Sequence, residues 1–307
     1  MLIEAQSVQG AYEGVLRLLR ERGAEVPCQS KPTREIVGAK VIITHPRRSI
    51  ITLPERKFNY RYALAEAMWN LLDRSDIGFL SRFSKGITKF VADQPEASQD
   101  HAHWAYGPQI HDQIGPAIAL LKEHPDSRRA IWRPGRDTRI EDRGLGTPPC
   151  LEFVQFLIRG EALHIVVFMR SNDAYLGMPY DMFTYSLWQI AMANALGVEV
   201  GTYTHMVGSL HYYMHDLEKI ENTMQFMGPY HQAKIASAPD MREVANCALM
   251  QDLITLEGTL EHAGEAPRIN QWRAPSWGPL LNVLQGNYEF ADGTFRTLQA
   301  KGIGVGW

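Results

Sequence analysis

Residues 148–181 read PPCLEFVQFLIRGEALHIVVFMRSNDAYLGMPYD, and this stretch guides the interpretation of the whole chain. Two apolar segments flank the turn-like residues 159–162, which predicts a hairpin of two largely buried strands. Cys150 begins the first strand, and the polar cluster 170–173 ends the second. A lone cysteine beside an apolar strand is most often a small buried hydrophobe, so only these neighbours favour a catalytic role.

The composition is that of a globular protein. The chain has 307 residues, of which 45% are hydrophobic and 21% charged, and its formal net charge is -3. This balance provides no basic field for a nucleic-acid backbone, so any bound anion must be held by local arginines. We expect a small ligand rather than a polymer, and a single domain that spans residues 1–307.

Cysteine usage and hydropathy indicate a cytoplasmic protein without a bound metal. Cys28, Cys150 and Cys247 are widely spaced and odd in number, which fits neither a disulfide framework nor a zinc cluster. The N-terminus lacks a basic segment followed by an apolar run, and no apolar stretch approaches the about 20 residues of a membrane helix. We therefore predict a cytoplasmic location and no membrane contact.

The chain alternates between predicted helices and strands. Apolar residues at helical spacing extend over 7–22, with Ser7 as a candidate cap and Gly23 as a stop. Residues 35–44 and 49–54 predict an early β-hairpin. Further helices are expected at 59–73, 108–124, 182–196 and 242–263, and a strand followed by a helix at 198–224. One α+β domain accommodates all these elements.

Several charged residues in these elements have two interpretations. Glu66 falls among apolar residues of its helix, where it either reaches solvent or is buried with a partner or a function. Arg128 and Arg129 are either solvated charges or phosphate ligands, and strand alternation lets at most one of them serve one face of a sheet. Asp181, close to the start of a predicted helix, is at first sight a helix cap.

A series of motifs, in order and spacing, resembles the folate-dependent thymidylate synthase family. The resemblance covers roughly residues 60–215 and is weak at the termini. It implies a thymidylate synthase-like three-layer α+β fold with a large mixed β-sheet packed by helices, and a homodimer joined sheet to sheet. The motifs are Glu66-x-x-Trp69, Tyr106-Gly107, Ser127-Arg128-Arg129, Pro149-Cys150 with a following Gln155-Phe156 pair, Arg170-Ser171-x-Asp173, Gly177-x-Pro179-Tyr180-Asp181 and Gly208-x-x-His211-x-Tyr213.

The resemblance also implies roles for the residues in these motifs. Cys150 would attack C6 of a pyrimidine nucleotide as the thiolate, with nearby arginines lowering its pKa. C5 would then take the one-carbon unit of 5,10-methylenetetrahydrofolate, with Glu66 and Tyr106 organising water and proton transfer. The implied nucleotide ligands are Arg170, Ser171, Asp181, His211 and Tyr213, with Arg128 and Arg129 acting in trans from the second subunit; the implied folate ligands are Asp173, Gly177 and Trp69.

Asp181 is the departure from the family pattern that narrows the substrate. Thymidylate synthases have asparagine there, whose amide donates to O4 of uracil and accepts from N3–H, whereas cytosine presents the reverse pattern. A protonated carboxyl donates to N3 and accepts from the amino group, and an ionised carboxyl pairs with an N3-protonated ring as the adduct forms. Both forms favour cytosine, although a protonated carboxyl also pairs with uracil. The same substitution is found in the deoxycytidylate hydroxymethylase branch of the family.

Other departures concern the ends of the chain and two positions near the site. Ser209 replaces an aspartate, and Asn172 stands where many synthases have cysteine. In the N-terminal phosphate loop, either Lys31 or Arg34 substitutes for the family's arginine. The tail ending at Trp307 differs from the usual synthase lid, which suggests a site that admits water.

We therefore predict 5-hydroxymethylation of a cytosine nucleotide, dCMP in the first place, by addition of Cys150 at C6 with 5,10-methylenetetrahydrofolate and water. Ser171 and Arg128 match the deoxy-specific synthases, but CMP, as used in nucleoside natural-product pathways, stays open. A thymidylate synthase acting on dUMP and a catalytically silent relative that binds nucleotides or RNA stay open as well. A methyltransferase using S-adenosylmethionine is disfavoured, since the sequence lacks an early strand, glycine-rich turn and helix.

Overall fold

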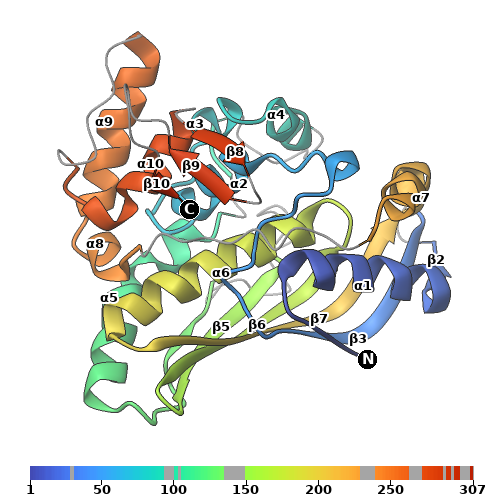
Figure 1. The fold of residues 1–307 in the computed structure, drawn as a ribbon, viewed down its shortest axis with the longest axis horizontal. Helices are drawn as coiled ribbons and strands as arrows, with labels where there is room; N and C mark the ends of the chain where they lie inside the picture. The colour runs from blue at the N-terminus through green and yellow to red at the C-terminus, as the bar shows by residue number, and fades with distance from the viewer. Residues whose placement is uncertain are drawn as a thin grey trace.

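The computed structural model describes residues 1–27, 31–92, 100–102, 105–134, 149–228, 239–262, 272–285, 288–291, 294–297 and 305–306. Cys28, Trp307, Pro148 and the loop that precedes it lie outside these residues. A mixed seven-stranded sheet forms the centre of the described part, in the order β1-β3-β7-β6-β5-β4 with β2 also on β3 (Figure 1). Its strands are β1 Leu2–Ala5, β2 Ala24–Val26, β3 Thr33–Ile43, β4 Ile131–Trp132, β5 Leu151–Arg159, β6 Ala162–Asp173 and β7 Glu199–Tyr213.

Helices pack on the sheet and gather beyond one of its ends. α1 and α6 lie over one face of the large sheet, and the C-terminal elements lie beside α2 and α3 (Figure 1). The helices are α1 Val8–Arg22, α2 Tyr60–Trp69, α3 Ile77–Ser81, α4 Lys85–Ala92, α5 Gly107–Glu123, α6 Gly177–Leu196, α7 Leu217–Gln225, α8 Met241–Ala245, α9 Ala248–His262 and α10 Gly278–Leu284. A small sheet follows, with β8 Tyr288–Ala291, β9 Thr294–Thr297 and β10 Val305–Gly306. This arrangement confirms the predicted α+β fold with a large mixed sheet packed by helices.

Several predicted elements form as their local sequence indicates. Ser7 Oγ accepts a hydrogen bond from the Gly10 amide at 3.1 Å and caps α1, which ends before Gly23. β5 and β6 form the predicted antiparallel hairpin. Its turn has Gly160 and Glu161 with φ of 56° and 64°, the left-handed region that a tight hairpin requires. Local chemistry therefore predicts both elements.

The predicted hairpin of residues 35–44 and 49–54 is wrong. β3 is a strand, but its neighbours are β1 and β7, so both of its edges are already taken. Residues 49–53 run without strand pairing, and the backbone N–H of Thr52 donates instead to Gln9 Oε1 at 2.9 Å. Ile50 and Ile51 are still buried, so the apolar pattern reflected burial rather than pairing.

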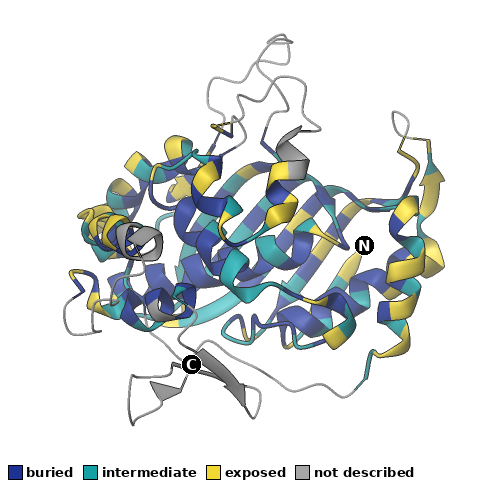
Figure 2. Cartoon of the chain, turned by 90° about the horizontal axis from the view of Figure 1, so that it is seen from above, coloured by how far each residue is buried: buried dark blue, intermediate teal, exposed yellow. Residues whose placement is uncertain are grey.

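The long helix α6 fixes the position of the residues near its start. It is buried along almost its whole length, and buried residues gather where the helices meet the sheet (Figure 2). Trp188 Nε1 donates to Ala67 O at 3.1 Å, which ties α6 to α2. Gln189 Nε2 donates to Leu163 O at 2.8 Å, which ties it to β6. The first turns of α6 therefore lie at a set place between α2 and the end of β6.

The opposite face of the sheet is more exposed. Along β6 and β7, the residues that alternate with the core are half-buried or exposed, and Met206 is 36% exposed. Phe153 and Phe168 stack on this face with their ring centroids 5.8 Å apart, and Val37 of β3 is 80% exposed. An apolar, partly exposed sheet face is a candidate interaction surface.

Polar contacts join the C-terminal helices to the region of α2. Arg74 pairs with Glu257 of α9 at 2.6 Å and with Asp76 at 2.7 Å. Arg61 Nε of α2 donates to Leu284 O of α10 at 3.1 Å. The organisation of residues 1–307 as one domain stays a prediction. Among the described residues, no helix combines the length and the apolar character that crossing a membrane requires.

Candidate active site

The β5–β6 hairpin positions Cys150. The residue directly precedes β5, and its carbonyl accepts a hydrogen bond from the Arg170 amide at 2.8 Å. Arg170 Nε also donates to Pro149 O at 3.0 Å, which fastens the Pro-Cys step to β6. The sulfur lies 3.7 Å from Ser171 Oγ. On the neighbouring strand β7, a Cβ at Gly208 would lie 2.6 Å from Arg170 O. The close approach of β7 to β6 therefore requires glycine at this position.

The thiol of Cys150 holds its proton more tightly than an exposed cysteine does. Burial raises its pKa, and the Arg170 guanidinium and the Ser171 hydroxyl offset only part of that effect. Arg170 does lower the pKa of the thiol, as expected of a nearby arginine, but burial outweighs this effect in the single chain. Arg128 and Arg129 are exposed, and within the described part of the chain Arg170 is the arginine that acts on the sulfur.

Glu66 is a half-buried carboxyl with a polar partner, which settles its two interpretations. Asn59 caps α2 by accepting from the Tyr62 amide at 3.0 Å, and Glu66 follows one turn later. The Tyr62 hydroxyl donates to Glu66 Oε1 at 2.8 Å. Burial raises the pKa of Glu66 to about 7, despite the opposing effect of this hydrogen bond. Such a carboxyl exchanges its proton near neutral pH.

Asp181 lies inside α6 and is not a helix cap. The helix begins four residues earlier, at Gly177, which places the Asp181 side chain one turn into it. Asn172 Nδ2 donates to Asp181 Oδ2 at 2.7 Å. Burial raises the pKa of Asp181 to about 8, and the nearby Glu66 carboxylate adds to the shift. At pH 7 the protonated acid therefore predominates.

Tyr106 completes a cluster with these residues. It stands at the N-cap position of α5 without a capping side-chain hydrogen bond, and its hydroxyl is hydrogen-bonded to the backbone of Leu151, next to the cysteine. Burial raises its pKa, and Asp181, Cys150 and Glu66 raise it further in that order. Asp181, Cys150 and Glu66 all lie close enough to act on this hydroxyl, so the fold brings the four predicted catalytic residues together.

The predicted sugar and phosphate ligands lie at the same end of the hairpin. Ser171 and Asp173 of β6 are register partners of Ser209 and His211 of β7. The ring centroids of His211 and Tyr213 are 5.2 Å apart.

Arg128 and Arg129 are not brought to Cys150 within one chain. The prediction that they enter a strand is wrong, because β4 begins at Ile131 and both arginines precede it. Arg128 O accepts from Gln155 Nε2 at 2.9 Å, and the Arg129 amide donates to Ser127 Oγ at 3.2 Å. Their backbones are therefore fixed while their side chains stay exposed.

The predicted folate ligands differ in what they offer. Asp173 Oδ1 accepts from the amides of Tyr175 and Leu176 at 2.9 and 3.3 Å. A Cβ at Gly177 would lie 3.6 Å from Asn172 Nδ2, so this glycine borders the bond between Asn172 and Asp181. Trp69 is only 2% exposed and its Nε1 donates to Asp76 O at 2.9 Å, so its indole is mainly core.

The two candidates for the N-terminal phosphate contact have different surroundings. Arg34 Nη2 pairs with Glu25 at 3.0 Å, and its Nη1 donates to Arg20 O at 3.1 Å. Lys31 is exposed. Arg34 is thus engaged by contacts within the chain.

Three further residues of the site were not predicted. The Tyr203 hydroxyl lies 2.7 Å from His205 Nδ1, and His205 Nε2 lies 2.9 Å from Asn172 Oδ1. In the sequence, Asn172 stands out only as a departure from the family pattern, and Tyr203 and His205 occur in a strand where alternation predicts burial. A histidine at a core position of a strand is the signal that points to such a polar network.

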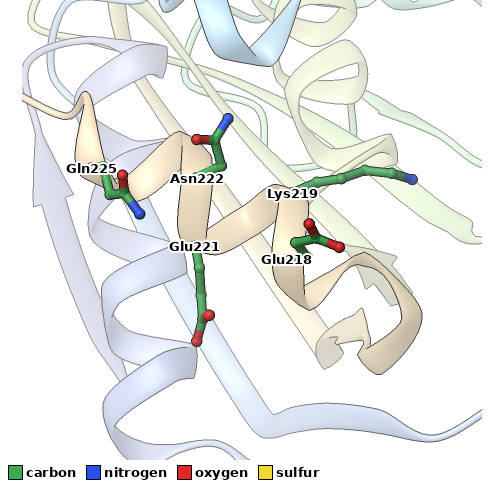
Figure 3. A pocket seen from close by; sticks show the side chains of 5 residues that line it. All are labelled: Glu218, Lys219, Glu221, Asn222 and Gln225. Atoms are coloured by element: carbon green, nitrogen blue, oxygen red, sulfur yellow. The ribbon is translucent and has the colours of Figure 1, made fainter.

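A surface pocket on α7 contains none of the predicted site residues. Its lining side chains are polar and lie along one helix, beside α1 (Figure 3). Glu221 pairs with Arg20 at 3.1 Å, and Lys219 pairs with Asp216 at 2.6 Å. The lining residues are Glu218, Lys219, Glu221, Asn222 and Gln225.

The raised pKa of Asp181 predicts a pH-dependent stability. The folded protein binds this proton more tightly than the unfolded chain, so the stabilisation is complete below about pH 4 and is lost as the pH rises through about 8. One pKa unit corresponds to about 1.4 kcal/mol. Between about pH 5 and pH 9, the free energy of unfolding should fall more for the wild type than for Asp181→Asn. The difference between the two falls should be at least about 1.4 kcal/mol.

Urea titrations at several pH values measure this difference. Asp112→Asn, which changes an exposed carboxyl, is the matched control and should follow the wild type. Parallel pH profiles for the wild type and Asp181→Asn would show that Asp181 is not protonated in the folded protein at neutral pH.

Comparisons with known proteins agree with the geometry. The family model described as thymidylate synthase matches residues 11–258. A thymidylate synthase of Symbiobacterium thermophilum is 30% identical over 208 residues, which cover 62% of this chain and 72% of that protein. The family match spans well over half of the chain and includes every residue of the cluster around Cys150. The chain belongs to the thymidylate synthase family.

Proposed function

We propose that this protein is a folate-dependent enzyme that hydroxymethylates C5 of a cytosine nucleotide, with dCMP as its preferred substrate. The observation that carries the proposal is the carboxyl of Asp181, which accepts a hydrogen bond from Asn172, lies near Cys150, Tyr106 and Glu66, and has a pKa that burial raises to about 8. A neutral carboxyl offers one donor and one acceptor, which match N3 and the 4-amino group of cytosine. The family supports a folate-dependent reaction at C5 of a pyrimidine nucleotide.

Cys150 starts the reaction in this proposal. Its sulfur bonds to C6, the electrons of the C5–C6 double bond move towards N3, and Asp181 gives its proton to N3 as that charge develops. Because burial raises the pKa of the free thiol, a neighbouring group must help to remove its proton, and Glu66 and Tyr106 are close enough to take part.

5,10-Methylenetetrahydrofolate, when bound, supplies the one-carbon unit that C5 takes. Asp173 fits the pterin part of this molecule, which presents N–H donors. Backbone amides hold Asp173 Oδ1, while its Oδ2 has no hydrogen bond to the described part of the chain, so it can accept from a ligand. Glu66, with a pKa of about 7, is suited to remove the C5 proton through water and to activate the water that completes the hydroxymethyl group.

The proposal includes a homodimer joined through the exposed sheet face. That face carries the stacked rings of Phe153 and Phe168 and the partly exposed Met206. Arg128 and Arg129 are exposed and have no place at their own Cys150, which is consistent with binding the nucleotide phosphate of the second subunit. In such a dimer they would also lower the pKa of the thiol.

Product identification tests the proposal directly. The protein is incubated with 5,10-methylenetetrahydrofolate and either dCMP, CMP or dUMP, and the products are analysed by mass spectrometry and by absorbance for dihydrofolate. We expect dCMP to gain one CH₂O unit with no dihydrofolate formed. Dihydrofolate with dUMP would identify a thymidylate synthase, faster turnover of CMP would move the substrate to ribonucleotides, and binding without turnover would identify a silent relative.

A further inference from the structure

A chain of hydrogen bonds leads from the buried face of the sheet to Asp181. The Tyr203 hydroxyl is 2.7 Å from His205 Nδ1, and His205 Nε2 is 2.9 Å from Asn172 Oδ1. Asn172 Nδ2 then donates to Asp181 Oδ2 at 2.7 Å. Tyr203 and His205 are 0% exposed and Asn172 is 4% exposed, so water does not substitute for these partners. The three residues act on the base only through Asp181.

The hydrogen bonds from Tyr203 to Asp181 all run in one direction. A neutral imidazole has one donor and one acceptor nitrogen. Asn172 Oδ1 can only accept, so His205 Nε2 carries the hydrogen and Nδ1 accepts from the Tyr203 hydroxyl. Burial lowers the pKa of His205 to about 3, so the ring stays neutral at any pH of interest. All three hydrogens therefore point towards Asp181.

This direction decides how the acid presents its proton. Because Asp181 Oδ2 already accepts from Asn172, the proton of the acid belongs on Oδ1. If the hydrogen bonds ran in the opposite direction, the Asn172 amide would be turned over. The proton of the Asp181 carboxyl would then be donated to Asn172 Oδ1 and not to the base. The remaining oxygen would then accept from uracil N3–H or from the cytosine amino group without distinction.

We propose that Tyr203, His205 and Asn172 are positioning residues that set base specificity by fixing which oxygen of Asp181 accepts and which carries the proton. The inference rests on the proposed function, in which Asp181 reads the base. It adds three residues, two from β7 and one from the end of β6, to the determinants of the substrate.

Tyr203→Phe tests this hydrogen-bonded network, since it removes the partner of His205 Nδ1 and leaves that buried nitrogen unpaired. The measured quantity is kcat/KM for dCMP divided by kcat/KM for dUMP. We expect this ratio to fall about tenfold in Tyr203→Phe and in His205→Leu, because a site with its polar groups left unpaired discriminates less. His205→Gln should restore most of the ratio, since its amide also donates to Asn172.

Tyr185→Phe is the matched control. Tyr185 is fully buried and its ring packs beside Tyr203 and His205, but its hydroxyl donates to Met169 Sδ at 3.4 Å, outside the chain. The ratio in this variant should stay within about twofold of the wild type, as for a lost hydrogen bond that does not touch the determinant. Thermal unfolding of all variants confirms that they are folded.

The outcomes separate this inference from the proposed function. If dCMP is turned over and Tyr203→Phe, His205→Leu and Tyr185→Phe all keep the wild-type ratio, the inference is overturned while the function stands. If neither nucleotide is turned over, the function fails, and calorimetric dissociation constants for dCMP and dUMP replace the kinetic ratio. If Tyr203→Phe loses the binding preference for dCMP over dUMP and Tyr185→Phe keeps it, the result supports the positioning role of Tyr203. Equal loss in both variants overturns that role.

Discussion

Cys150→Ala lowers kcat by at least about 10³-fold in the expected result, because it removes the only atom of the cluster that can bond to C6. The dissociation constant of the nucleotide should change by less than about threefold, since phosphate and sugar contacts dominate binding in the proposed site. Single-turnover assays and calorimetry measure the two quantities. The variant also loses the bonded adduct that mass spectrometry would detect in the wild type.

Cys247→Ala is the control for this substitution. Cys247 is an exposed free cysteine between α8 and α9, far along the chain from the hairpin. It should keep wild-type kcat. Retention of activity by Cys150→Ala, or its loss in Cys247→Ala, would contradict nucleophilic attack by Cys150.

Asp181→Asn changes the base that the enzyme prefers. The asparagine carbonyl accepts from Asn172 Nδ2, as Asp181 Oδ2 does, so its NH₂ group faces the substrate and donates to O4 of uracil. The ratio of kcat/KM for dCMP over dUMP should fall by about 10²-fold or more, the size expected when a hydrogen-bonding site meets the wrong pattern. Competition assays with both nucleotides measure this ratio.

Glu66→Gln separates base reading from proton transfer. It removes the other carboxyl of the cluster whose pKa is raised. The turnover of dCMP and of dUMP should slow alike, so the ratio of their kcat/KM values should stay unchanged. An unchanged ratio in Asp181→Asn would remove the main argument for cytosine. A changed ratio in Glu66→Gln would move base reading from Asp181 to Glu66.

Local sequence predicts the elements whose ends are set by neighbouring residues. Ser7 and Asn59 cap their helices through hydrogen bonds to amides three residues later. The β5–β6 hairpin follows from two apolar segments and a glycine-bearing turn. The hairpin predicted at 35–54 fails because strand partners are chosen by long-range packing, and β7, about 170 residues away, outcompetes the adjacent segment.

Part of the candidate site is likewise predicted by local sequence motifs, and part of it depends on long-range contacts. Motifs identify Cys150, Glu66, Tyr106 and Asp181, and the fold brings them together. The bond between His205 and Asn172 spans 33 residues, so no spacing rule predicts it. The sequence also does not predict the pKa of the thiol, since this pKa depends on how burial balances against Arg170 and Ser171. Long-range polar networks and desolvation are properties of the assembled fold.

The raised pKa of Cys150 has a consequence for the protein between turnovers. Oxidants and alkylating agents react with the thiolate, and a buried thiol that keeps its proton reacts slowly with both. Burial of the thiol in the single chain therefore protects Cys150 from such reagents.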